Sequence, residues 1–205
     1  MINYRTTPFH SNTSSRRAAV VALSLAALLA ATGAVTATAT RTLAYSTATA
    51  RQVQRQPRAG ACHALGTGLY ARPDARCTPG ALNPQVSPAT IATTICHSGW
   101  TATVRPPESI TRSEKLASLL AYSDQLGASA YEYDHLVPLE LGGAVNDPRN
   151  LWPEPDYGVR SGFYLNPKDR LERVLNRLVC DGTMRLATAQ RLIATDWVSA
   201  FRSYG

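Results

Sequence analysis

An aspartate and a histidine stand side by side, Asp134 and His135, within the largely apolar run YEYDHLVPLELGG (Tyr131–Gly143). Burying ionisable groups in such a run costs free energy unless they are paired or used. A histidine titrates near neutral pH, so it can take a proton from water, and a carboxylate oxygen is a hard ligand for Mg²⁺. Together the two residue types could supply a general base and a metal ligand to a hydrolytic site.

Two strands and the loop between them must position this pair. The pattern predicts one strand over Tyr131–Val137 and a short second strand around Asn150–Trp152. Adjacent residues on a strand point to opposite faces, so Asp134 and His135 can share a site only where the strand bends or ends. Loop-forming residues favour such irregular ends and are expected to bound both strands: Pro138, Gly142, Gly143, Pro153 and Pro155.

A helix is predicted to follow the second strand. Asn166 is a good N-cap, Pro167 suits the first helical position and Gly182 suits the end. The apolar stripe has helical spacing: Leu171, Val174, Leu175, Leu178 and Val179. A last helix is expected from about Leu186 to Phe201, with its buried side formed by Leu192, Ile193, Trp197 and Phe201.

Upstream of the Asp-His pair, the pattern predicts two short strands and a helix. Thr94–Cys96 and Thr101–Arg105 are short and β-branched, as in a hairpin. Thr111 with Glu114 three residues later forms a capping box, so a helix is expected to begin there and to stop at Gly127. Its packed face is expected to carry Leu116, Leu119 and Leu120.

The first 39 residues have the pattern of a secretory signal peptide. Three arginines and no acid precede the apolar run of residues 18–37, and a small-residue exit follows at Ala37-Thr38-Ala39. Without cleavage, residues 18–37 would anchor the chain in a membrane. Residues 40–59 are expected to be a disordered leader or linker, and residues 60–205 the single domain. Removing the three arginines from the net charge of +7 leaves +4, which is compatible with a polyanionic partner without requiring one.

Four cysteines remain in the exported chain: Cys62, Cys77, Cys96 and Cys180. An even number in an exported protein indicates two disulfides, and four cysteines allow three pairings. No C-x-x-C spacing occurs, which disfavours a zinc ribbon. The favoured pairing is Cys62–Cys77 and Cys96–Cys180, although the sequence alone leaves the pairing open.

The predicted order of strand, glycine-containing loop, strand and helix resembles the HNH nuclease motif. Asp134 and His135 lie on the first strand of this pattern, and Asn150 follows 15 residues after the histidine. The longer string DHLVPLELGG…NDPRNLWPEP, then KDRLE and ATDW, with ICHSGWTATVRPP upstream, is similar to exported bacterial HNH-like proteins. The resemblance spans roughly residues 78–197. It implies an α+β fold with a ββα-metal core, flanked here by further helices and the disulfides.

The resemblance also implies a chemistry, metal-dependent hydrolysis of phosphodiester bonds. His135 would be the general base, Asp134 a ligand of Mg²⁺ (or of Mn²⁺ or Zn²⁺), and Asn150 the residue that braces the loop and orients the histidine. The family places a further ligand on the helix. Nine residues after Asn150, where many members carry it, stands Val159, which cannot bind metal.

The helix ligand is therefore expected at Asp169, with Asn166 as the second choice, although an acid at position 169 would equally stabilise the helix start. Lys168 and Arg170 are expected either to contact substrate phosphates or merely to face solvent.

The expected function is a secreted endonuclease acting on nucleic acid, DNA more than RNA. Two alternatives remain open. One is a degenerate HNH-like domain that binds nucleic acid or a cell-envelope partner without cutting. The other is a structural, disulfide-stapled secreted protein in which Asp134 and His135 pair internally. The sequence leaves the oligomeric state open.

Overall fold

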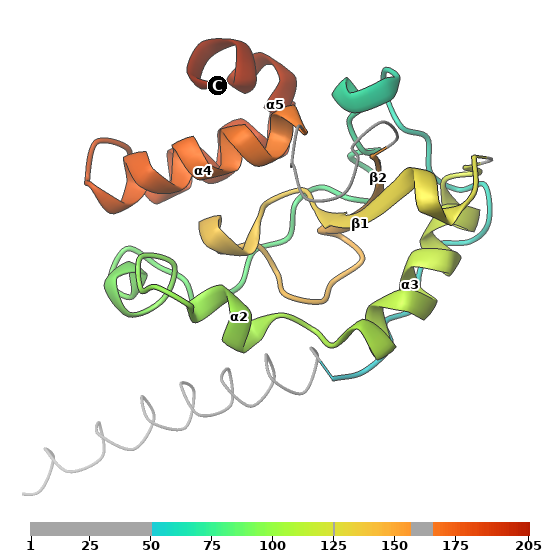
Figure 1. Cartoon of the computed structure of the whole chain (residues 1–205), viewed down its shortest axis with the longest axis horizontal. Coiled ribbons are helices and arrows are strands. Elements are labelled where there is room, and N and C mark those ends of the chain that lie inside the picture. The colour runs from blue at the N-terminus through green and yellow to red at the C-terminus, as the bar shows by residue number, and fades with distance from the viewer. Residues whose placement is uncertain (1–50, 125, 157–165) are drawn as a thin grey trace, which may run out of the picture.

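The computed structural model describes residues 51–124, 126–156 and 166–205. Within these ranges the chain is a small mixed α+β domain with four α-helices, a two-stranded sheet and two disulfides (Figure 1). The helices are α2 (Trp100–Val104), α3 (Glu108–Ala121), α4 (Pro167–Cys180) and α5 (Leu186–Tyr204), and the strands are β1 (Tyr131–His135) and β2 (Leu151–Pro155). Short 3₁₀ turns are η1 (Gly68–Tyr70), η2 (Ile91–Thr93), η3 (Ala128–Ala130) and η4 (Leu139–Leu141).

The expected signal segment, residues 1–39, lies outside the described residues, as does the first part of the expected leader. The remaining part of that leader, residues 51–59, joins the domain: the Gln54 backbone N–H donates to the Glu114 carboxylate (2.6 Å), and the Gln52 carbonyl accepts from Asn146 (2.9 Å). Within the described ranges, no helix combines the length and the apolar composition that crossing a membrane requires.

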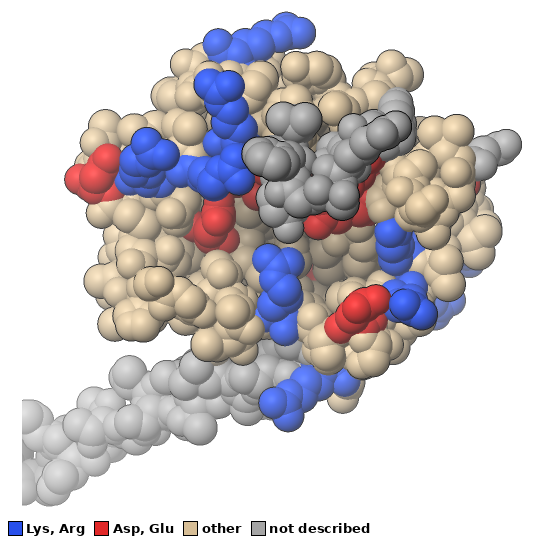
Figure 2. All heavy atoms as spheres, in the orientation of Figure 1, with Lys and Arg blue, Asp and Glu red and all other residues tan. Residues whose placement is uncertain are grey.

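Charged side chains mark one face of the domain. Figure 2 shows acidic side chains in a hollow of this face, with lysine and arginine side chains around it. The hollow lies where the two strands and α4 meet in Figure 1.

The sheet is an antiparallel pair in which Glu132 lies opposite Glu154, Asp134 opposite Trp152 and His135 opposite Leu151. Directly opposed residues share a face of a sheet. Asp134 and Glu154 therefore lie on one face and His135 on the other. β1 ends at His135, two residues before the expected end.

Strand β2 runs through Pro153 and Pro155, which were expected to end it. In a two-stranded sheet each strand is an edge, so a proline can sit where its missing N–H is not needed by the partner strand. Trp152, directly before Pro153, is fully buried.

The expected hairpin upstream is wrong. Thr94–Cys96 forms turns after η2, and the expected strand Thr101–Arg105 is mostly the short helix α2. The β-branched residues satisfy their hydroxyls on nearby carbonyls instead: Thr94 donates to the Thr90 carbonyl (2.7 Å), and Thr103 to the Trp100 carbonyl (2.7 Å). Such local bonds override strand propensity.

Helix α3 begins at Glu108, after Pro107, and not at Thr111. Glu114 makes no capping box, because it is buried and bound to Gln54 and Asn146. The helix also ends before Gly127, since Ser123 takes a left-handed conformation (φ +56°) close after it. Of its expected apolar face, Leu119 is buried, while Leu116 and Leu120 are 53% and 66% exposed.

Helices α4 and α5 follow the sequence closely. Asn166 caps α4 by accepting the Lys168 backbone N–H, and Gly182 (φ +81°) follows the last turn. Each turn of α4 buries an apolar residue: Leu171, Leu175 and Val179 are buried, and Val174 and Leu178 are half-buried. α5 continues to Tyr204 with a kink at Asp196, and buries Ile193 and Trp197. These residues form the core with Trp152.

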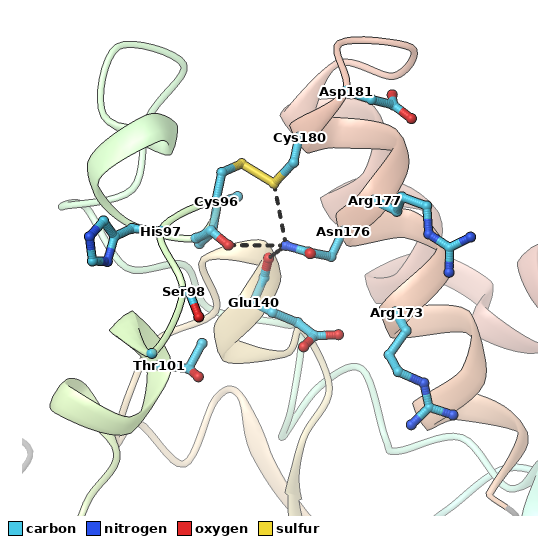
Figure 3. Close-up of a pocket in the computed structure, with 12 residues that line it drawn as sticks. Cys96, His97, Ser98, Thr101, Glu140, Arg173, Asn176, Arg177, Cys180 and Asp181 are labelled. Atoms are coloured by element: carbon cyan, nitrogen blue, oxygen red, sulfur yellow. Dashed lines mark hydrogen bonds between the residues drawn. A yellow bond between two sulfur atoms is a disulfide. The ribbon is translucent and has the colours of Figure 1, made fainter.

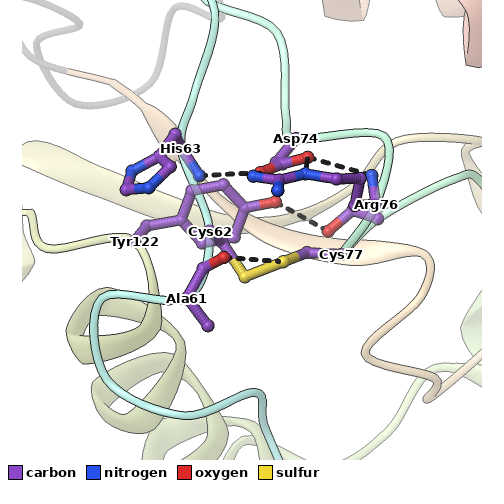
Figure 4. The surroundings of a disulfide bond; sticks show 8 residues. Ala61, Cys62, His63, Asp74, Arg76, Cys77 and Tyr122 are labelled. Atoms are coloured by element: carbon purple, nitrogen blue, oxygen red, sulfur yellow. Dashed lines mark hydrogen bonds and ion pairs between the residues drawn. A yellow bond between two sulfur atoms is a disulfide. The ribbon is translucent and has the colours of Figure 1, made fainter.

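Both favoured disulfide pairings are confirmed. Cys96–Cys180 joins the turn before α2 to the last residue of α4 (Figure 3). Cys62–Cys77 closes a shorter loop, where Asp74 accepts from the His63 backbone and pairs with Arg76 (Figure 4). Each bridge fixes a segment that has little regular structure.

The two bridges are expected to stabilise the domain unequally, because a crosslink restricts the unfolded chain more when it closes a longer loop. Their sequence separations are 84 and 15 residues. Replacing Cys96 and Cys180 by serine should lower the free energy of unfolding by about 4–5 kcal/mol, and replacing Cys62 and Cys77 by about 3 kcal/mol. Urea unfolding of the two double variants measures both losses. A larger loss from the Cys62–Cys77 pair would contradict this expectation.

Candidate active site

His135 is held in one orientation by a single backbone contact. Its ring is buried, and Nε2 lies 2.9 Å from the Val145 carbonyl oxygen. A carbonyl only accepts hydrogen bonds, so Nε2 carries the proton and Nδ1 of the neutral ring bears the lone pair. Nδ1 has no hydrogen-bond partner among the residues described. The geometry therefore leaves Nδ1 as the basic atom.

The environment keeps His135 neutral at ordinary pH. Burial lowers the pKa of His135, and the positive charges of Arg105 and Lys168 lower it further. The Asp134 carboxylate and the Val145 hydrogen bond raise the pKa but do not outweigh burial. A neutral imidazole is the form that accepts a proton.

Asn150 ties together the loop that carries Val145. Its fully buried side chain accepts the Val137 N–H (2.9 Å) and donates to the carbonyls of Val137 (2.9 Å) and Ala144 (3.1 Å). A Cβ on Gly143 would lie 1.7 Å from the Val137 oxygen and 2.6 Å from Asn150 Nδ2, so only glycine fits there. Asn150 thus braces the loop one residue before the Val145 carbonyl that orients His135.

Lys168 was expected to contact phosphate, but it lies inside the protein. Its side chain has no exposed surface, and Nζ contacts Asp134 of β1, Glu154 of β2 (3.2 Å) and Glu172 of α4 (2.6 Å). A buried ammonium needs such partners, because leaving it unpaired would cost several kcal/mol. Arg170, the other expected phosphate contact, is exposed on α4.

The carboxylates around Lys168 outnumber its single positive charge. Burial raises the pKa of Glu154 to about 8. Burial and the negative charge of Asp134 together raise the pKa of Glu132 to about 7. Burial raises the pKa of Glu172 as well. Asp134 is the exception: burial favours its neutral form, but the adjacent Lys168 ammonium holds its pKa below the ordinary value. Asp134 is therefore the ionised member of the cluster.

Two of the three residues expected to hold a divalent cation fit that role. The Asp134 side chain is 20% exposed, and Asp169 is half-buried with an Oδ2 that is buried and lacks a hydrogen-bond partner in the described residues. Burial and the negative charge of Asp134 raise the pKa of Asp169. Mg²⁺ commonly takes one or two carboxylates and completes its shell with water and substrate phosphates. The ranges described contain no ready-made group of three or more His, Cys, Asp or Glu side chains for a metal.

Asn166 does not fit as a metal ligand. Its Oδ1 accepts the Lys168 backbone N–H (2.9 Å), and its Nδ2 donates to Glu154 (2.8 Å). Both ends of the amide are thus committed, and Asn166 acts as the helix cap and as a link between α4 and β2.

Sequence reasoning missed Glu154, Glu172 and Glu132. Glu172 could have been found, since it lies four residues after Lys168 within KDRLE, the spacing of a helical ion pair. Glu154 and Glu132 face each other only through the register of the sheet. The short motif gives no signal for that register.

Removing the brace should destabilise the loop. Asn150→Ala would leave the N–H and carbonyl of Val137 and the carbonyl of Ala144 without their buried partner. We expect the free energy of unfolding to fall by about 2–4 kcal/mol, since unpaired buried groups cost about 1–3 kcal/mol each. Chemical unfolding measures the change, and a loss below about 0.5 kcal/mol would contradict the bracing role.

Stability of the metal-free protein should fall as pH rises from about 5 to about 8. In the folded state Glu154 and Glu132 keep protons up to pKa values of about 8 and about 7, whereas the unfolded chain releases them near 4.5. Above the unfolded pKa the folded state binds more protons, so its stability decreases with pH.

Glu154→Gln should flatten this slope. The matched control is Asp181→Asn, because Asp181 is exposed and hydrogen bonds from Thr183 lower its pKa. Titration of Asp181 therefore changes the stability only at acid pH. Urea unfolding in EDTA at several pH values gives the comparison. Equal slopes for wild type and Glu154→Gln would refute the assignment.

Comparison with known proteins assigns no family to this domain. No family model, no curated protein and no solved structure matches the chain. Its function must be inferred from its own residues: a histidine of fixed tautomer, the aspartate beside it and the loop that Asn150 braces.

Proposed function

We propose that this chain is a secreted, metal-dependent endonuclease that hydrolyses phosphodiester bonds of nucleic acid, with DNA as its substrate. The observation that carries the proposal is the Nε2 contact of His135 with the Val145 carbonyl, which leaves Nδ1 as a base one residue from an ionised aspartate. The two disulfides and the signal-like start of the sequence support export.

His135 takes a proton from the attacking water at Nδ1, while its Nε2–H stays on Val145. The buried ring remains neutral below the ordinary histidine pKa, so the base stays available at mildly acid pH. Asp134 and Asp169 would hold the divalent ion, which, when bound, supplies positive charge to the phosphate and leaving oxygens. Asn150 holds the adjacent Ala144 carbonyl and so keeps the loop that carries Val145 in place during these steps.

Little sequence preference is expected of this nuclease. The residues assigned above act on a phosphate and on water, and none of them is a base-reading side chain. Contacts to the backbone of nucleic acid position a substrate without reading its sequence.

One observation favours a second candidate, a domain that binds nucleic acid without cutting it. The Lys168 ammonium already pairs with Asp134 and supplies a cation at that carboxylate. If this ion pair persists in solution, Asp134 holds no metal and catalysis fails, although basic side chains could still bind phosphates.

A plasmid-nicking assay with Mg²⁺, Mn²⁺ or EDTA tests the proposal. Wild type should nick supercoiled plasmid with a divalent ion and not with EDTA. His135→Ala should lower the rate about 10²–10⁴-fold, the usual contribution of a general base. His63→Ala is the matched control, because His63 is exposed and contacts Asp74 only through its backbone.

His135→Gln provides a second variant that retains an N–H donor for Val145, in case the alanine variant unfolds. Purified mature protein that binds DNA but never nicks it with any divalent ion would favour the non-cutting candidate. Protein that neither binds nor nicks would favour a structural role. Full activity of His135→Gln would exclude His135 as the base.

A further inference from the structure

We propose that the cavity beside the Cys96–Cys180 disulfide binds phosphates of the nucleic-acid backbone next to the one being cut, through Arg173 and Arg177. This inference rests on the proposed function and extends it, since it states where the substrate strand lies. It also replaces Lys168, which is buried, as the source of phosphate contacts.

The cavity has a volume of about 630 Å³ and lies between two walls. One wall is the turn from Ile95 to Gly99 with Thr101, and the other is the second half of α4 (Figure 3). Binding sites for small ligands commonly have volumes of about 300–1,000 Å³, so a sugar-phosphate unit fits.

The walls are fixed before any ligand arrives. The Cys96–Cys180 bridge joins them at one end. Asn176 joins them again, since its Nδ2 donates to the carbonyls of Glu140 (2.7 Å) and Ile95 (3.3 Å), as Figure 3 shows. A preformed cavity loses less conformational entropy on binding.

Two arginines on one face of α4 supply the basic groups of the cavity. Arg173 and Arg177 are exposed and stand four residues apart, and neither forms an ion pair with a described residue. Like charges at this helical spacing repel each other, so the pair costs some stability unless an anion lies between them.

Two acids also line the cavity and must be counted. Asp181 lies at the exposed end of α4 and accepts the Thr183 backbone N–H. Glu140 is more enclosed: burial raises its pKa, while Arg173 lowers it. Its carboxylate points toward the Arg173 side in Figure 3, so Arg173 offsets this charge. Arg177 in turn offsets the charge of Asp181. Both arginines are exposed and can still contact an anion.

Helix α4 connects the cavity to the candidate active site. Asp169, Arg173 and Arg177 follow one another at four-residue intervals, which places them about 6 Å apart along one side of the helix. Arg173 acts electrostatically on both Asp169 and Glu140. A strand whose scissile phosphate lies at Asp134 and Asp169 would thus place its next phosphates along the two arginines.

This regular arrangement favours a polymer over a single anion. One phosphate would need one of the arginines, whereas a chain of phosphates can contact both while it reaches the acidic site. The shared chemistry is the phosphodiester or phosphate anion, and inorganic phosphate serves as the competing probe.

The test measures binding without cleavage. A fluorescent single-stranded oligonucleotide is titrated with mature protein in EDTA at several salt concentrations, and anisotropy gives the affinity. Arg173→Gln/Arg177→Gln should weaken binding and reduce the slope of log affinity against log salt by about 1.4, since each contact to a single strand contributes about 0.7. Arg191→Gln/Arg202→Gln on α5 removes the same charge from exposed positions and should leave the slope unchanged.

The outcomes separate this inference from the proposed function. If wild type binds with the expected salt slope but never nicks plasmid, the nuclease proposal fails and the cavity proposal stands. If wild type nicks plasmid but the Arg173/Arg177 variant binds like the Arg191/Arg202 variant, the cavity proposal fails alone. If millimolar inorganic phosphate displaces the oligonucleotide completely at constant ionic strength, the cavity is a site for single anions and the strand placement is wrong.

Discussion

The buried ammonium of Lys168 joins the three elements on which the rest of the site depends. Its carboxylate partners come from β1, β2 and α4, so burying one lysine requires all three to meet. Asn166 adds a neutral hydrogen bond from the start of α4 to Glu154 of β2. Losing one partner of a buried ion pair typically costs about 3–5 kcal/mol, because the remaining charge is left uncompensated. The cluster therefore fixes where α4 begins relative to the sheet, and with it the position of Asp169, whose pKa the Asp134 charge raises.

This anchoring has an electrostatic consequence for any nucleic-acid substrate. A group of carboxylates repels a polyanion, and raised pKa values at Glu132, Glu154 and Glu172 lessen that repulsion by keeping part of the group protonated. Arg105 acts on His135 and Glu140, and Arg173 acts on Asp169 and Glu140. Positive charge thus lies close to the acids, and for the proposed substrate it would offset their repulsion of phosphate.

Local signals in the sequence determined the parts of the fold that depend on neighbouring residues. Asn166 with Pro167 predicted the start of α4, Gly182 its end, and the cysteine pattern the two bridges. Signals failed where a distant segment decided the outcome. Thr111 and Glu114 have capping-box spacing, but Glu114 is bound by Gln54, which is 60 residues away in sequence. Lys168 looked like a surface residue because nothing local shows that Asp134 and Glu154 converge on it.

The adjacency of Asp134 and His135 does not by itself place them in one site. Strand geometry sends Asp134 toward Lys168 and α4, and His135 toward Val145 in the loop. The proposed common site depends on the end of β1 at His135, where the following loop is held by Asn150 and passes so close at Gly143 that no side chain fits. The loop orients the base and the ion cluster orients the carboxylate. Each residue of the pair is therefore positioned by a different part of the chain, and the proposed common site requires both supports.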